Sequence, residues 1–384
     1  MENSYTRFDD LRSFARLQPY EQSKLREAAR IAIEVSLKVK QGEQVLIIGN
    51  PEPASAAISE VLYDASLNVG AYPVLIYQQR KTQLDFAEPA VISALYARPD
   101  VIISISADKM GKDPQGISTP FEYDGKKFDS YFHLLLHGEK CSRAFWSPSV
   151  TVDSFIRTVP IDYAELARSC ASIKDVLDRA VSVRITAPGG TDITIGLRNR
   201  EAKSDDGNFS FMGSGGNLPA GETFISPENG TAQGRICFDG SISTNSGDVI
   251  IGQPISCRVE NGFVREISGG SEAEFLLQTI KAGELNAMEL ERTGKLSNGS
   301  GEIYARNARN IGELGIGLNP MAVISGNMLE DEKAFRTCHF AIGMNYDDDA
   351  PSLIHLDGLV KNPTITAVFD NGRELVIERE GELV

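Results

Sequence analysis

Cysteine is scarce in this sequence, and the cysteines that occur are scattered. There are five among 384 residues, an odd number with no Cys-x-x-Cys pair. This spacing favours neither a disulfide framework nor a structural zinc knot. Histidine is rarer still, with four residues in the whole chain. Two histidines close together in the sequence therefore stand out.

The sequence also lacks long apolar runs and clusters of basic residues. No stretch approaches the roughly twenty apolar residues of a membrane span, and the opening MENSYTRFDD lacks the apolar stretch of a signal peptide. The 38 basic and 53 acidic residues give a net charge of -15, which disfavours nucleic acids and anionic membranes as partners. We therefore expect a cytoplasmic protein that binds neither nucleic acid nor membrane.

The first half of the chain alternates apolar strands with helices. Residues 20–41 have the apolar spacing of an amphipathic helix, and the apolar run 44–48 is typical of a buried parallel strand. Such alternation predicts an open, Rossmann-like α/β domain, which we place at residues 1–180. The further predicted elements are helices at 54–67 and 87–97 and strands at 73–77, 101–106 and 143–146.

This first domain lacks the fingerprint of a dinucleotide-binding protein. The first strand is followed by Gly-Asn-Pro-Glu-Pro at 49–53, where a Gly-x-Gly-x-x-Gly turn would be required. The later glycine-rich segment 213–216 is not set in a strand-turn-helix pattern, and we interpret it as a loop.

The second half, residues 181–384, has the pattern of an α+β domain. Short strands alternate with turns, and Asn-Gly pairs at 261–262 and 371–372 predict hairpins. Helices are predicted at 272–282 and 305–313. With 384 residues the chain is long enough for two such domains.

Two of the four histidines lie in strand-like runs of this second domain. His339 follows Thr-Cys, and His355 is followed by Leu-Asp. Period-two alternation places His355 and Asp357 on one face of a strand. Imidazole nitrogen and carboxylate oxygen form a ligand set for Zn, Co, Mn or Fe(II). A single buried histidine is more often a hydrogen-bonded core residue, but Glu313, Glu332 and Tyr346 also fall within residues 313–357.

His133 and His137 are spaced four residues apart on a predicted helix, which brings both rings to one face. A zincin site would require glutamate directly after the first histidine, and this chain has leucine there. We predict that these two histidines are not metal ligands.

Several segments of the second half carry a family resemblance in their order and context. They include APGGTDIT at 187–194, LPAGETF at 218–224, RNIGELGIG at 309–317, HFAIG at 339–343 and HLD at 355–357. In these segments the chain resembles the metallo-aminopeptidases of the aminopeptidase T, aminopeptidase S and PepS family. Weaker likeness extends through the first domain.

The resemblance implies a homodimer that removes N-terminal residues from short peptides. It implies two divalent ions per chain, usually Zn or Co, with Mn or Fe as further possibilities. Glu313 would bridge the two ions, Tyr346 would be the active-site tyrosine, and Glu222 or Glu332 could accept a proton from water. Glu332 lies seven residues before His339, whereas some members of the family have a glutamate five before it, where this chain has Ala334. The metal ligands implied in this way are Glu222, Glu313, Glu332, His339, His355 and Asp357.

Other segments resemble a branch that includes the 2,5-dihydroxypyridine dioxygenases, which cleave an aromatic ring with one Fe(II). These are HLDGLV at 355–360, GGSEAEF at 269–275 and GLNP at 317–320. In those dioxygenases a histidine stands where this chain has Glu313, and the position of His339 is not preserved as histidine. These two positions favour the peptidase, and the dioxygenase is the alternative function.

Overall fold

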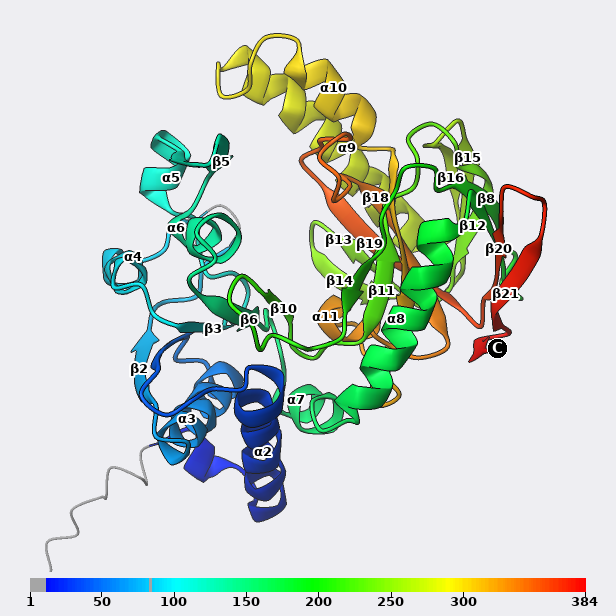
Figure 1. Ribbon diagram of the computed structural model, residues 1–384. Helices are drawn as coiled ribbons and strands as arrows, with labels where there is room; N and C mark the ends of the chain where they lie inside the picture. The colour runs from blue at the N-terminus through cyan, green and yellow to red at the C-terminus, as the bar shows by residue number, and fades with distance from the viewer. Residues whose placement is uncertain (1–11, 83–84) are drawn as a thin grey trace, which may run out of the picture. The chain divides into compact units, whose positions relative to one another are not determined.

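The computed structural model describes residues 12–82 and 85–384, which form two compact units (Figure 1). The first unit contains the described residues up to Tyr163 together with Gly207–Ala220, and the second contains Ala164–Asp206 and Gly221–Val384. The predicted division near residue 180 differs from this grouping, because 164–180 lies in the second unit and 207–220 in the first.

The first unit is built on a five-stranded parallel sheet with the order β10-β6-β3-β1-β2. Parallel neighbours require crossover connections, and the chain supplies helices between the successive strands β1, β2 and β3. β1 and β3 are buried apolar runs, as the sequence predicts for a parallel sheet. The bounds are η1 (Phe14–Arg16), α2 (Pro19–Ile31), η2 (Ala32–Ser36), β1 (Gln44–Gly49), α3 (Pro53–Asn68), β2 (Tyr72–Tyr77), α4 (Pro89–Tyr96), β3 (Val101–Ile105), α5 (Pro114–Ser118), β4 (Phe121–Tyr123), β5 (Lys126–Phe128), α6 (Tyr131–His133), η3 (Leu134–Gly138), β6 (Arg143–Trp146), α7 (Val152–Thr158) and β10 (Gly215–Asn217).

The glycine-rich segment 213–216 was wrongly predicted to be only a loop. Its last two glycines begin the edge strand β10, which pairs in parallel with β6. A Cβ atom on Gly215 would lie 3.0 Å from the Ala144 carbonyl oxygen and 3.1 Å from the Trp146 ring. Glycine therefore permits the close approach of this edge strand.

The predicted helix at 20–41 is also too long. The α-helical part ends at Ile31, a π-helical turn follows as η2, and the backbone leaves the helix after Leu37. The buried Arg143 guanidinium donates to the carbonyls of Leu37 (2.8 Å) and Lys38 (3.2 Å). These bonds satisfy carbonyls that would otherwise lack partners at the helix end.

The second unit contains two antiparallel sheets. A seven-stranded sheet has the order β14-β13-β19-β18-β17-β11-β9, and an eight-stranded sheet has the order β16-β15-β12-β8-β7-β20-β21-β22. Both predicted Asn-Gly hairpins are confirmed, since β15 pairs with β16 and β20 pairs with β21. The strands are β7 (Ser182–Thr186), β8 (Asp192–Gly196), β9 (Lys203–Asp205), β11 (Glu222–Ile225), β12 (Gln233–Phe238), β13 (Ser241–Thr244), β14 (Gly247–Ile250), β15 (Ile255–Glu260), β16 (Phe263–Ser268), β17 (Ile311–Gly317), β18 (Thr337–Gly343), β19 (His355–Lys361), β20 (Thr364–Val368), β21 (Glu374–Arg379) and β22 (Glu382–Leu383), and the helices are α8 (Tyr163–Arg179), α9 (Ser271–Arg292), α10 (Ser300–Asn307) and α11 (Met328–Asp331).

The predicted helix at 305–313 is wrong in its second half. Helix α10 ends at Asn307, and Glu313 lies on strand β17. The alternation of glycine with larger residues from Gly312 to Gly317 disfavours a helix. It suits a strand with close neighbours, since a Cβ atom on Gly312 would lie 2.3 Å from the Met344 carbonyl oxygen.

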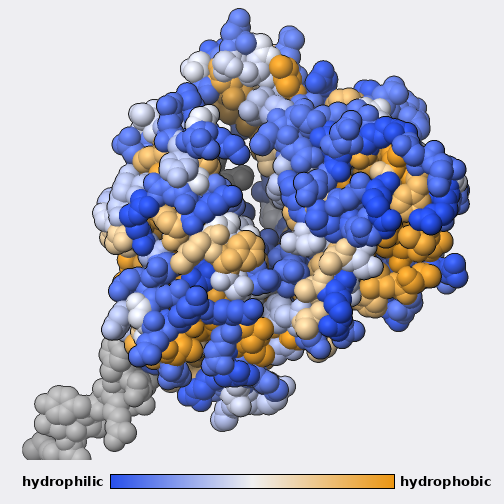
Figure 2. Space-filling model, viewed as in Figure 1, coloured by the Kyte–Doolittle hydropathy of each residue, from blue (hydrophilic) through white to orange (hydrophobic). Residues whose placement is uncertain are grey.

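Apolar side chains form the interior of each unit, while polar side chains predominate on the face shown in Figure 2. In the first unit, one buried cluster joins Leu46 and Ile48 of β1 to Ile102 of β3 and to Leu95 and Leu135 of the covering helices. No helix within the described residues combines the length and apolar character that a bilayer crossing requires. The molecule thus has a mixed α/β fold with one parallel sheet and two larger antiparallel sheets.

Candidate metal centre

Adjacent strands of the seven-stranded sheet bring together residues that lie far apart in the sequence. In the β17–β18 ladder Gly315 pairs with His339, and in the β18–β19 ladder Ala341 pairs with Asp357. On the other side of β17, Glu222 of β11 pairs with Gly317. The predicted ligands Glu222, Glu313, His339, His355 and Asp357 therefore lie on four neighbouring strands (Figure 1).

The two oxygens of Glu313 face two different imidazoles. Oε1 lies 3.6 Å from Nε2 of His339, and Oε2 lies 3.1 Å from Nε2 of His355. The His339 nitrogen is also 3.4 Å from Oε2 of Glu222, and the His355 nitrogen is 3.3 Å from Oδ1 of Asp357. Glu313 therefore takes part in two ligand groups, one with Glu222 and His339 and the other with His355 and Asp357.

Glu332 belongs to a third group, with His339 and Asp357. In each of the three groups, the ligand atoms lie within 4.8 Å of one another. Glu332 follows the short helix α11, so a loop and not the sheet presents it to the cluster. The structure thus places all six predicted ligands together, while their binding of metal stays a prediction.

Two features hold the histidine rings in place. Nδ1 of His355 donates to the Met344 carbonyl oxygen at 2.8 Å, which leaves Nε2 to face the carboxylates. The His339 ring occupies the space above Gly315, where a Cβ atom would lie 2.0 Å from the ring. A glycine at position 315 is therefore required for this position of His339.

Several polar atoms of the cluster are buried without a hydrogen-bond partner among the described residues. They are Oε2 of Glu222, Nδ1 of His339 and Oδ1 of Asp357. Unsatisfied buried polar atoms are costly, and two of these three are carboxylate oxygens directed at imidazole nitrogens. This donor set of nitrogen and oxygen atoms fits divalent ions such as Zn or Co.

The pKa values of the cluster show its excess of negative charge. Burial raises the pKa of Glu332 to about 8, with Glu222 and Asp357 adding to the rise and Lys333 opposing it. Burial acts against a charged imidazole, yet Glu313 and Glu222 raise the pKa of His339 to about 9. In the absence of another cation, protons are therefore drawn to these residues, and a divalent ion would compete with them.

Tyr346 lies in the loop after β18, beside the cluster. Its ring is 5.0 Å from that of His355 and 5.3 Å from that of Phe224, measured between centroids. Desolvation, followed by the charges of Glu313 and Asp357, raises the pKa of its hydroxyl well above the usual value. The raised pKa keeps the phenol protonated, so it can donate a hydrogen bond, and the residue is 44% exposed.

Sequence reasoning missed two charged residues of the site. Lys333 is completely buried, with its Nζ 2.5 Å from Glu222, 2.8 Å from Glu332 and 3.3 Å from Asp205. Asp205 pairs with Glu222 across β9 and β11. A lysine flanked by acidic residues is typical of a solvated surface, so the local sequence gave no sign of its burial.

His133 and His137 lie in the first unit, with ring centroids 5.9 Å apart. His133 Nδ1 is 3.1 Å from Oδ1 of Asp129. Neither histidine belongs to a ligand group among the described residues. That they do not bind metal stays a prediction.

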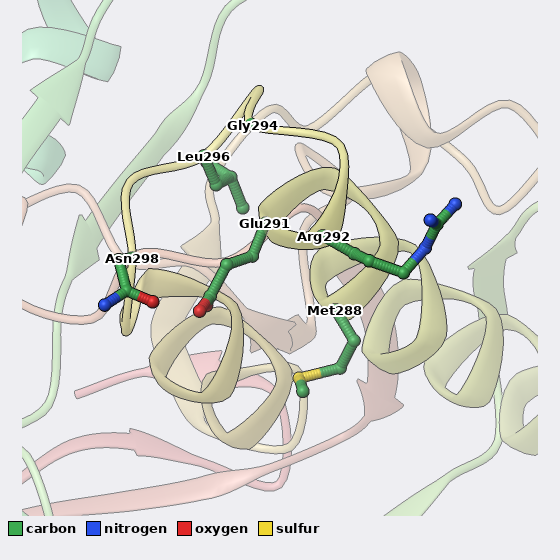
Figure 3. Close-up of a pocket in the computed structure, with 6 residues that line it drawn as sticks. All are labelled: Met288, Glu291, Arg292, Gly294, Leu296 and Asn298. Atoms are coloured by element: carbon green, nitrogen blue, oxygen red, sulfur yellow. The ribbon is translucent and has the colours of Figure 1, made fainter.

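A separate hollow of about 410 Å³ lies where α9 leads into α10 (Figure 3). Its one carboxylate, Glu291, accepts hydrogen bonds from the backbone of Gly299 and Gly301 at the start of α10. This carboxylate therefore serves the helix end, and the chemistry-bearing residues are those of the seven-stranded sheet. The hollow is lined by Met288, Glu291, Arg292, Gly294, Leu296 and Asn298.

Comparison with known proteins gives a match to one family model and matches to solved structures, two of which follow. The family model of NicX, 2,5-dihydroxypyridine 5,6-dioxygenase, matches residues 151–340. That stretch contains Glu313 and His339 but ends before Tyr346, His355 and Asp357. No curated protein matches the sequence.

The two structures match nearly the whole chain. The 2,5-dihydroxypyridine dioxygenase from Pseudomonas putida KT2440 has a TM-score of 0.67 and 17% identity, covering 94% of this chain and 97% of its own. Wild-type AmpT from Thermus thermophilus has a TM-score of 0.65 and 16% identity, covering 94% of this chain and 99% of its own. This chain shares their fold. At such identities the likeness extends to the fold alone, and the family match favours the dioxygenase side of the resemblance.

Proposed function

We propose that this protein is a metal-dependent aminopeptidase that removes N-terminal residues from short peptides. The observation that carries the proposal is the arrangement of Glu313, whose two oxygens face His339 and His355 separately. A carboxylate placed in this way suits a bridge between two divalent ions. Glu222 and His339 would complete the ligands of one ion, and His355 and Asp357 those of the other.

The grouping of the histidines also supports a dinuclear centre. A mononuclear Fe(II) dioxygenase site requires two histidines and one carboxylate on one face of a single ion. Each of the three ligand groups among the described residues contains one histidine only. The two imidazoles are thus divided between groups that share Glu313.

When bound, two divalent ions would supply polarisation of the scissile carbonyl, activation of a water molecule and binding of the substrate amine. Glu332, presented from a loop beside His339 and Asp357, is placed to accept a proton from water. Tyr346 is suited to donate a hydrogen bond to the developing oxyanion, because its phenol stays protonated beside His355. The surrounding carboxylates favour a substrate with a free ammonium group.

A ring-cleaving Fe(II) dioxygenase is the second candidate. The NicX family match over residues 151–340 favours it. In that case His355 and Asp357 would supply two ligands of a single Fe(II), with a further histidine needed for the third. His339 is the histidine nearest to this role, although Glu313 lies between the two imidazoles.

The two candidates are separated by loading metal-free protein with Zn, Co or Fe(II) and measuring two reactions side by side. We expect about two ions per chain by elemental analysis and release of the N-terminal residue from aminoacyl amides and dipeptides. Glu313→Gln should abolish this hydrolysis. The double variant His133→Ala/His137→Ala serves as the control and should retain both metal and activity. One Fe per chain with oxygen uptake on 2,5-dihydroxypyridine, and no peptide hydrolysis, would show that the second candidate is correct.

A further inference from the structure

Lys333 is a completely buried cation in contact with the carboxylates of the centre. Burial of an unpaired ammonium group costs several kcal/mol, but here Nζ lies within 3.3 Å of Glu222, Glu332 and Asp205. Three carboxyl groups therefore surround one ammonium group.

The backbone around Lys333 is held by hydrogen bonds that do not involve the metal ligands. The Lys333 carbonyl accepts from Asn319 N at 2.8 Å, and Lys333 N donates to the Glu330 carbonyl at 3.0 Å. Asp331, two residues earlier, accepts from Ser241 Oγ at 2.6 Å and from Ser325 N at 2.7 Å. The position from which the lysine side chain extends is thus determined by the loop and not by the cluster.

Lys333 binds only one of the two carboxylate oxygens of Glu222. Oε1 accepts a hydrogen bond from Nζ at 2.5 Å. Oε2 is buried, has no hydrogen-bond partner among the described residues and lies 3.4 Å from Nε2 of His339. With one oxygen bound by the lysine, the other is directed towards His339 and is the one available to an ion.

We propose that Lys333 is a positioning residue that holds Glu222 in the orientation needed to bind one of the two ions. It chiefly sets the affinity of the ion held by Glu222, Glu313 and His339, because it binds Glu222 directly and makes no hydrogen bond with His355 or Asp357 among the described contacts. The inference rests on the metal binding of the proposed function, but not on the reaction.

The first test is the zinc affinity of Lys333→Met, measured by calorimetric titration of metal-free protein. The variant removes the charge and keeps an unbranched side chain that is one atom shorter. We expect one ion to bind about 10–100-fold more weakly, as for other residues that orient a ligand, and the second ion to keep its affinity within about threefold. Lys361→Met, on the exposed end of β19, is the matched control and should titrate like the wild type.

A double-variant cycle tests whether Lys333 acts through Glu222. In a Glu222→Gln background, adding Lys333→Met should change zinc affinity by no more than about threefold, because the oriented carboxylate is already lost. This double variant removes one buried charge of each sign and so leaves no unpaired charge at this contact. It can therefore be measured even if Lys333→Met alone does not fold. An additional tenfold loss in the double variant, or wild-type affinity for both ions in Lys333→Met, would overturn the proposal.

Failure of the proposed function would appear in the peptide assay and not in the zinc titration of Lys333→Met. If the wild type binds two ions and hydrolyses no peptide, the aminopeptidase proposal fails. The effect of Lys333→Met on zinc affinity still decides the role of the lysine, because that measurement uses no substrate.

Discussion

Glu378 is a carboxyl group that the fold buries without a hydrogen-bond partner for either oxygen among the described residues. Burial, with a smaller contribution from Glu382, raises its pKa from 4.5 to about 8. Between these two values the folded protein holds a proton that the unfolded chain has released. The stability of the protein therefore falls as the pH rises through this window, and the full cost is present above pH 8.

Glu378→Gln should remove this pH dependence. At pH 7 we expect the variant to be more stable than the wild type by up to about 3 kcal/mol, and near pH 4.5 the difference should vanish. Urea unfolding at several pH values measures it. Glu374→Gln, at an exposed position on the same strand, is the control. An equal stability difference at pH 5 and pH 8 would contradict the assignment.

The role of Gly315 follows from a single close contact, with the ring of His339. A Cβ atom there would lie 2.0 Å from the His339 ring, so Gly315→Ala must displace the imidazole. We expect zinc affinity to fall by at least about tenfold while the circular dichroism spectrum stays that of the wild type. Gly252→Ala, where a Cβ atom would meet nothing closer than 3.4 Å, should bind zinc normally. Unchanged affinity in Gly315→Ala would mean that His339 is not a ligand.

At the scale of elements, the centre depends on the register of three antiparallel strands. β17, β18 and β19 carry Glu313, His339, and the pair His355 and Asp357 respectively. A slip of one residue in any of these strands would turn its ligands to the opposite face. The regular ladder of β18 with β19, from Thr337 opposite Lys361 to Gly343 opposite His355, keeps this register.

In the first unit, Arg143 connects a strand to the end of a helix. Its guanidinium donates to the carbonyls of Leu37 and Lys38 and pairs with Glu43 at 2.6 Å. Arg143→Met leaves buried carbonyls and a carboxylate without their partner, and we expect a loss of about 3–5 kcal/mol in the free energy of unfolding. Urea denaturation measures this loss. Arg184→Met, which breaks the exposed pair with Asp192, should leave the stability nearly unchanged; an equal loss in both variants would show that burial is not the cause.

At the scale of the whole molecule, the two compact units are joined where the chain passes between them near residues 163, 206 and 220. The first unit receives β10 from the segment between the second and third of these passages, so its parallel sheet is completed by residues that follow α8, β7, β8 and β9 of the second unit. Neither unit is therefore a single continuous segment.

The assembly state stays a prediction from the family resemblance. We propose a homodimer, so light scattering after gel filtration should give about twice the chain mass of 41.8 kDa. The Lys361→Met control should give the same mass, because one exposed lysine on the seven-stranded sheet is not expected to decide assembly. A mass equal to a single chain at micromolar concentration would contradict the proposal.

The sequence alone determined what short-range patterns encode. Apolar runs and helical spacing located β1, β2, β3, β6 and the helices α3 and α4 of the first unit, and Asn-Gly pairs located two hairpins, since both signals depend on neighbouring residues. The His-x-Asp spacing, together with the family resemblance, identified all six residues that the structure places in the cluster.

Only the tertiary structure decided how those residues are combined. Glu313 lies on a strand because β17 pairs with β11 and β18, although the preceding residues have helical character. The backbone leaves the helical conformation after Leu37, where Arg143 binds the carbonyls of Leu37 and Lys38, and Gly215 joins an edge strand because β6 lies beside it. Lys333 is buried because Asp205 and Glu222, from strands far away in the sequence, pair with its ammonium group. Each outcome depends on partners that are distant in the sequence, and local patterns carry no information about such partners.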